Sequence, residues 1–135
     1  MRVLFDLNVL IDVACRWQAF PASLDLYNRI VASPTDAGLF AACGYTTLYY
    51  VIKQLLSEAR TQAILAQFRQ RLVLLPFNAR IATAAHLLQM SDLEDACIAA
   101  TAFEGRCEVI ATRNVADFVA SPIPARSPEE ILAVL

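Results

Sequence analysis

The amino-acid sequence predicts an α/β fold, a three-layer α/β/α sandwich around a mainly parallel sheet, and two observations carry this prediction. Short apolar runs alternate with segments of helical periodicity from one end of the chain to the other. No internal repeat, low-complexity tract or linker interrupts the alternation. With 135 residues, 58% of them hydrophobic, the chain is long and apolar enough for a packed core, so we expect a single domain over residues 1–135.

The first half of the chain is expected to open with a buried strand. RVLFD is a continuous apolar run that ends in an acid, which suits a parallel strand covered on both faces. GLFAACG is the next compact apolar run, and Leu48, Ile52 and Leu55 recur at helical spacing after it. The predicted elements are a strand over 2–6, helices over 8–17 and 21–33, a strand over 38–44, and helices over 46–57 and 58–72.

The second half continues the same alternation. LVLLP is stopped by Pro76, and Asn78 is placed to cap the helix that follows. SDLEDACIAATAFEG begins with capping residues, and Pro128 lies near the first turn of the last helix. The predicted elements are a strand over 72–76, helices over 78–90 and 91–105, a strand over 107–114, and a brief extended piece with a final helix within 123–135.

The composition argues against an exported or membrane-bound protein. No apolar stretch reaches the roughly 18 residues that a membrane-spanning helix requires. Asp6 and Asp12 interrupt the apolar N-terminus, which makes it a poor export signal. We therefore expect a cytoplasmic protein that does not bind membranes.

Metal binding through cysteine and a global attraction to nucleic acid are also disfavoured. The four cysteines include no C-x-x-C pair, and the single His86 cannot complete a zinc site, so buried reduced thiols are expected. The net charge of −2 gives the protein as a whole no electrostatic attraction to a polyanion. Ten of the eleven cationic side chains are Arg, the residue best suited to local phosphate contacts.

Acidic residues follow predicted strands or open a predicted helix. They are Asp6, Asp92, Glu94, Asp95 and Asp117. Because parallel strands end at the same edge of a sheet, which is where such folds bind ligands, these carboxylates are expected to come together. Clustered carboxylates repel one another, and a hard divalent cation is the usual compensation. Such a site can activate water for phosphodiester hydrolysis.

Ordinary structural roles explain some of the same residues. Ser91-x-x-Glu94 fits a capping box, and first-turn acids are favoured by the helix dipole, which leaves Asp92 and Asp95 less well explained. Asp12 reads as a solvent-exposed or capping acid. Arg113 is either a surface cation or a contact for phosphate.

Three segments in order, FDLNVLID, SDLEDACIAATA, and VIATRNVADF followed by SPIPARSPEEIL, resemble the PIN-domain family of metal-dependent ribonucleases, which includes VapC-type toxins of toxin–antitoxin pairs. The resemblance covers nearly the whole chain. It implies an α/β/α sandwich that binds Mg²⁺ or Mn²⁺ at one edge and hydrolyses single-stranded regions of RNA. It also implies a homodimer and a cognate antitoxin as a partner.

The resemblance assigns roles to the acids residue by residue. Asp6, Asp95 and Asp117 match the catalytic, metal-binding acids, and Asp92 matches an additional metal-binding acid of the subgroup with a D-x-x-D-A pattern. These four side chains are therefore the expected ligands of the cation.

The same resemblance implies supporting residues around Asp6. Asn8 would support Asp6, and Thr112 and Asn114 would shape the turn or contact the water on the metal. Arg113, on that turn, is the residue expected to contact an RNA phosphate. Arg16 and Lys53 are secondary candidates for a phosphate track.

One departure from the family pattern bears on activity. The family normally supplies an acid, usually Glu, near the start of the helix after the second strand, but no acid occurs between Asp36 and Glu58. Thr47 or Tyr50 stands where that acid is expected. Three possibilities follow: Asp92 compensates, Thr47 contributes a hydroxyl through water, or the site is impaired.

Two other functions compete with a nuclease. A non-catalytic PIN-like module would bind RNA or a protein partner through the same fold. A phosphoryl-transfer enzyme or receiver domain of another α/β family would use Asp6 as a nucleophile. Such phosphatases require a second Asp where Asn8 stands, and receiver domains require an acidic pair and a Lys at the end of a late strand. The only Lys, Lys53, is in the wrong place for both.

Overall fold

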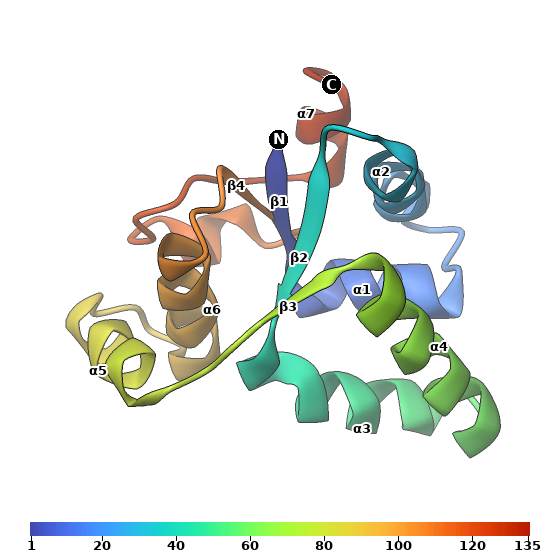
Figure 1. The fold of residues 1–135 in the computed structure, drawn as a ribbon, viewed down its shortest axis with the longest axis horizontal. Coiled ribbons are helices and arrows are strands. Elements are labelled where there is room, and N and C mark those ends of the chain that lie inside the picture. The colour runs from blue at the N-terminus through green and yellow to red at the C-terminus, as the bar shows by residue number, and fades with distance from the viewer.

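The structure of the protein, a computed structural model, describes all 135 residues and has helices on both faces of a five-stranded parallel sheet (Figure 1). The predicted α/β/α architecture is therefore confirmed. The strands are β1 (Arg2–Phe5), β2 (Ala37–Ala41), β3 (Val73–Leu75), β4 (Val109–Ala111) and β5 (Ala125–Arg126). The helices are α1 (Leu7–Cys15), α2 (Pro21–Ala32), α3 (Tyr45–Leu55), α4 (Glu58–Arg71), α5 (Ala79–Leu87), α6 (Leu93–Glu104) and α7 (Pro128–Leu132), with 3₁₀ turns η1 (Ala42–Gly44) and η2 (Val115–Phe118).

The strand order, β3-β2-β1-β4-β5, places β1 at the centre of the sheet. In register, Val3 lies between Gly38 of β2 and Val109 of β4. The chain proceeds outward from β1 to β3 and then returns to the opposite side of β1 as β4. The order of the strands thus reverses between β1 and β4, and their C-terminal ends, which point downward in Figure 1, form the switch point at which parallel sheets bind ligands.

One face of the sheet is covered by α1, α2, α3, α4 and α7. Val3 and Phe5 of β1 point to this side and belong to the largest buried cluster, together with side chains from all five helices. Phe5, Tyr27 and Phe68 pack as successive tilted or edge-on aromatic pairs within it. This cluster fixes α1, and with it the residues that follow Asp6, against the sheet.

The other face of the sheet is covered by α6, with α5 packed outside it. Leu4 points to this side because successive strand residues alternate between faces, and it packs with Ile98 and Ala99 of α6. Residues 96–102 of α6 are all buried, since the sheet and α5 enclose the helix. The small side chains of the Ala-rich helix allow this close packing.

The largest differences from the expected elements lie at strand ends. The apolar run over 38–44 ends as a strand at Ala41 and continues as η1, and the run over 107–114 forms a strand only at Val109–Ala111. The extended piece predicted within 123–135 forms β5, which pairs with β4 in parallel. None of the helices combines the length and apolar character that a membrane-crossing segment needs.

Candidate active site

Asp6 lies directly after β1 and forms the N-cap of α1. Its Oδ1 accepts the Leu7 N–H at 2.8 Å, and its Oδ2 accepts the Thr112 hydroxyl at 2.7 Å and the Asn8 amide at 3.1 Å. The side chain is buried, and burial raises the pKa of its carboxyl group against the opposing effect of these hydrogen bonds. Asp6 is thus held rigidly at the switch point.

Thr112 ties the end of β4 to the end of β1. Besides donating to Asp6, its Oγ1 accepts the Asn8 side-chain amide at 3.2 Å and the Asn114 backbone N–H at 3.0 Å. Asn8 in turn accepts the Arg113 backbone N–H at 3.2 Å through its Oδ1. The structure therefore brings Asn8 and Thr112 against Asp6, and it places Asn114 in the turn through its main chain.

The start of α6 differs from the expected capping box, and that prediction is wrong. Asp92, not Ser91, is the N-cap, and its Oδ1 accepts the Asp95 N–H at 2.9 Å. Glu94 does not reach back to the cap; its Oε2 accepts the Thr47 hydroxyl of α3 at 2.9 Å. Each acid of the first turn thus has a different environment, because tertiary contacts and not only the helix end position them.

Asp95 is the acid of this turn whose carboxylate has no hydrogen bond or ion pair within the described 135 residues. Burial, followed by the negative charges of four other acids, raises its pKa to about 7. Those four acids are Asp6, Asp92, Asp117 and Glu94. The electrostatic effects of acids from separate elements therefore combine at Asp95.

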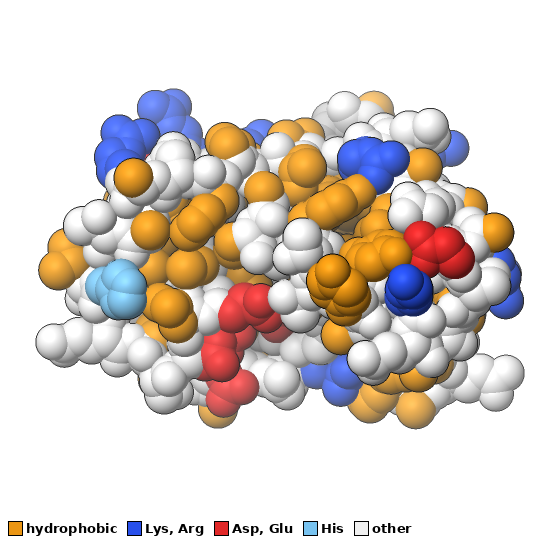
Figure 2. All heavy atoms as spheres, turned by 90° about the horizontal axis from the view of Figure 1, so that it is seen from below, with side chains coloured by type: hydrophobic (Ala, Val, Ile, Leu, Met, Phe, Trp, Pro, Cys, Tyr) orange, Lys and Arg blue, Asp and Glu red, His pale blue; other side chains and the backbone are white.

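Asp117 lies in η2, after the turn that follows β4, and is exposed. Seen from below, toward the C-terminal ends of the strands, the molecule carries one continuous group of acidic side chains near its centre (Figure 2). Tyr50, by contrast, is exposed and packs against Tyr49, so of the two residues considered for the missing acid only Thr47 contacts an acid of α6.

The carboxylate oxygens present suit a hard divalent cation, although these side chains do not form a complete coordination shell. No three acidic, His or Cys side chains lie close enough to one another to hold a metal ion. However, Mg²⁺ commonly uses one or two carboxylates and retains several waters. The free carboxylate of Asp95, beside four like charges, is the group here that a cation would stabilise most.

Arg113 has a partner that the sequence reasoning missed. Its Nε and Nη2 donate to the two carboxylate oxygens of Asp12 at 2.9 and 3.2 Å, and its guanidinium lies 3.8 Å from the centre of the Phe20 ring. Asp12 is 1% exposed and also accepts the Ser23 hydroxyl at 2.7 Å, so the interpretation of Asp12 as a solvent-exposed or capping acid is wrong. The spacing of four between Asn8 and Asp12 puts both on one face of α1, but it does not identify Arg113 as the partner of Asp12.

The two secondary cations lie at the far ends of their helices. Arg16 caps the C-terminus of α1, and Lys53 lies in the last turn of α3, where it pairs with Glu58 at 3.6 Å. Both helices begin at the edge that carries the acids, so Arg16 and Lys53 lie at the ends away from it.

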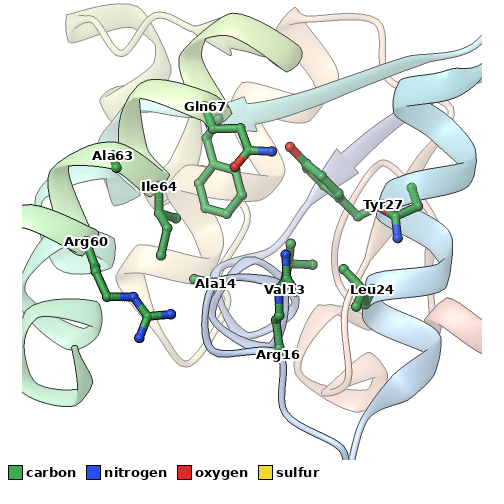
Figure 3. A pocket seen from close by; sticks show the side chains of 11 residues that line it. Val13, Ala14, Arg16, Leu24, Tyr27, Arg60, Ala63, Ile64 and Gln67 are labelled. Atoms are coloured by element: carbon green, nitrogen blue, oxygen red, sulfur yellow. The ribbon is translucent and has the colours of Figure 1, made fainter. Parts of the chain in front are cut away.

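A cavity between three helices lies away from the acids. It measures about 290 Å³ and is lined by α1, α2 and α4 (Figure 3). Tyr27 of α2 extends toward Gln67 of α4, and its buried hydroxyl has no hydrogen-bond partner. No acidic residue lines this cavity, so it is separate from the candidate active site.

Comparisons with solved structures reveal the same fold in complexes of bacterial proteins. VapBC2 from Rickettsia felis, bound to a promoter DNA fragment, is 15% identical with a TM-score of 0.74, covering 94% of this chain and 98% of that one. FitAcB from Neisseria gonorrhoeae is 22% identical with a TM-score of 0.71, with the same two coverages. A toxin-antitoxin complex from Klebsiella pneumoniae is 26% identical with a TM-score of 0.69, covering 93% and 97%.

A search of the curated proteins gave no significant match. The sequence profile described as PIN domain, however, matches residues 2–116, which include Asp6, the start of α6 and the turn after β4. With its fold and most of its length accounted for in this way, the chain belongs to the PIN-domain family.

Proposed function

We propose that this PIN domain is a metal-dependent ribonuclease that hydrolyses phosphodiester bonds of RNA and acts as the toxin of a toxin–antitoxin pair. PIN domains are generally nucleases. The observation that carries the proposal is the convergence of acids on Asp95, whose pKa is raised by burial and by the charges of Asp6, Asp92, Asp117 and Glu94. Such a concentration of negative charge costs stability unless a cation compensates for it.

The proposed catalytic acids are Asp6, Asp95 and Asp117, with Asp92 as a further ligand through the oxygen that does not cap α6. Mg²⁺ or Mn²⁺, when bound, would supply positive charge to the phosphate as negative charge develops in the transition state. Asp6 holds its oxygens in fixed positions because Thr112 and Asn8 hydrogen-bond to it. Asp95 has a carboxylate free to orient the attacking water and to accept its proton.

Arg113 has fewer N–H groups available to bind phosphate than a free surface Arg would have. Two of its guanidinium N–H groups are used by Asp12, and its side chain is 27% exposed. Contact with an RNA phosphate would then come from the remaining N–H groups, while the ion pair fixes the orientation of the turn that carries Asn114.

The first experiment is cleavage of a pool of tRNA and rRNA fragments with Mn²⁺, Mg²⁺ or EDTA. The variant is Asp95→Asn, and the matched control is Asp25→Asn, an exposed acid on α2 that makes no hydrogen bond or ion pair. We expect metal-dependent cleavage by the wild type and the control and none by Asp95→Asn. If no protein cleaves RNA under any metal condition, the nuclease proposal fails and the chain is better described as a non-catalytic PIN module.

The proposed protein partner is an antitoxin encoded beside this chain. Support comes from the solved structures, which are VapBC, FitAB and toxin-antitoxin assemblies that match 93–96% of this chain. Expression of this chain alone should arrest growth, co-expression with the neighbouring small gene should restore it, and Asp95→Asn should be harmless. Growth arrest by Asp95→Asn at the same level would contradict toxicity through nuclease activity.

We also propose a homodimer. Large apolar side chains remain exposed on the α5–α6 layer, including Leu87 at 77% and Phe103 at 60%. Apolar surface of this kind is commonly covered by association. Molar mass measured by light scattering should be twice that of the 14.9 kDa chain, and a value equal to one chain at micromolar concentration would contradict the dimer.

A further inference from the structure

Helix α3 contains no acid, yet a carboxylate lies against its first turn. The helix begins directly after η1 at the edge that carries the acids, and its sequence, YTTLYYVIKQL, has no Asp or Glu. At its third residue, the Thr47 hydroxyl donates to Glu94 Oε2 at 2.9 Å. The negative charge beside α3 is therefore supplied by α6, across the site.

Glu94 lies in the first turn of α6, between two proposed ligands of the cation. Asp92 caps this turn with one carboxylate oxygen, and Asp95, the residue after Glu94, has a carboxylate without a hydrogen bond. The bond from Thr47 to Glu94 thus joins the start of α3 to the turn of α6 that carries these two acids.

Glu94 neither caps α6 nor neutralises a cation. Asp92 already caps the helix, and Glu94 forms no ion pair with any Lys or Arg of the chain. A half-buried carboxylate with one neutral hydrogen bond and like charges nearby is destabilising in the absence of a cation. Thr47 fixes one oxygen of Glu94 and leaves the other free for a ligand.

We propose that Glu94, positioned by Thr47, is the acid that completes the metal site in place of the one absent from α3. The inference rests on the proposed nuclease function and deepens it. It replaces the possibilities that Thr47 itself is a ligand or that the missing acid impairs the site. Thr47 is then a positioning residue, which acts through the side chain of Glu94.

The test measures Mn²⁺ affinity by calorimetry and unfolding without metal, so that neither readout depends on cleavage. Glu94→Gln keeps an oxygen that accepts the Thr47 hydroxyl but removes the charge. We expect it to weaken Mn²⁺ binding by about tenfold or more and to raise the unfolding temperature of the metal-free protein, because a like charge is removed. Glu104→Gln, on the same helix but paired with Arg80 at its other end, is the matched control and should change neither quantity.

Variants of Thr47 separate positioning from ligation. Thr47→Val should weaken Mn²⁺ binding several-fold, and Thr47→Ser, which keeps the hydroxyl, should restore it. If Glu94→Gln binds Mn²⁺ as the wild type does while Asp95→Asn does not, the role of Glu94 is overturned and the proposed function stands. If the wild type itself binds no Mn²⁺, the proposed metal site and the role of Glu94 are both overturned.

Discussion

The guanidinium of Arg113 forms two hydrogen bonds with the buried carboxylate of Asp12, joining the turn after β4 to the middle of α1. The two residues are 101 positions apart in the chain, and the Phe20 ring lies against the guanidinium. Because the neighbouring Asn8 of α1 binds the backbone of the same turn, one face of α1 holds that turn at two points. The geometry around Asp6 therefore depends on an ion pair that lies outside the group of acids.

Removing Asp12 should destabilise the protein through this pair. Asp12→Ala leaves the partly buried Arg113 and the buried Ser23 without their acceptor, and we expect a loss of about 2–3 kcal/mol in the free energy of unfolding. Urea denaturation measures it, with Asp25→Ala on the exposed side of α2 as the control, expected to change stability by less than about 0.5 kcal/mol. Equal values for the two variants would mean that the ion pair contributes nothing.

The stability of the metal-free protein should depend on pH through Asp95. Its pKa is raised from 3.8 to about 7, so between these values the folded state binds more protons than the unfolded state. The free energy of unfolding should therefore decrease as the pH rises from about 4 to 7 and then level off. The raised pKa of Asp6 adds a contribution of the same sign.

Asp95→Asn tests this dependence directly. Its side chain cannot ionise, so the variant should be more stable than the wild type at pH 8 in EDTA, and the difference should shrink toward pH 4. Thermal unfolding across this range provides the measurement. A wild-type stability that rises between pH 4 and 7 in parallel with that of the variant would contradict the raised pKa.

The hydroxyl of Thr112 should matter more than its shape. Thr112→Val is nearly isosteric, but it removes the bond to Asp6 and the acceptor of the Asn114 N–H in a fully buried place. We expect a loss of about 2 kcal/mol in stability and a clear decrease in RNA cleavage. Thr112→Ser should recover cleavage more fully than stability. Cleavage by the Val variant at the wild-type rate would show that Asp6 does not need this bond.

Tyr27→Phe should stabilise the protein. The buried Tyr27 hydroxyl in the cavity between α2 and α4 has no hydrogen-bond partner, and removing an unsatisfied buried group avoids its desolvation cost of about 1 kcal/mol. The aromatic contacts with Phe5 and Phe68 are retained. Chemical denaturation would reveal the gain. A loss of stability would mean that the hydroxyl has a partner, such as a bound water.

The fold could be predicted because local pattern and tertiary environment agree along most of the chain. RVLFD reads as a buried strand, and it occupies the central position in the sheet, where both faces are covered. The Ala-rich helix and the Asn78 cap were also recognisable from sequence, and the structure has both. The strand predicted over 107–114 is shorter in the structure, Val109–Ala111, and after it the Thr112 side chain and the Arg113 backbone N–H bind Asp6 and Asn8.

The site was only partly predictable, since its decisive contacts join residues far apart in the chain. The local motif Ser91-x-x-Glu94 indicated a capping box, whereas Glu94 binds Thr47, 47 residues away. Asp12 likewise gave no local sign of burial until its partner was placed by the fold. Spacing along a helix can suggest which residues share a face, but it cannot identify what packs against that face.

The bond between Asp6 and Thr112 has a consequence for the order in which the protein is made. Asp6 is translated 106 residues before Thr112, which directly follows β4. Until then β1 lacks its neighbour β4 in the sheet, and the turn with Asn114 is absent. A nascent chain of this protein therefore has no assembled site until the segment that carries β4 and Thr112 has been made.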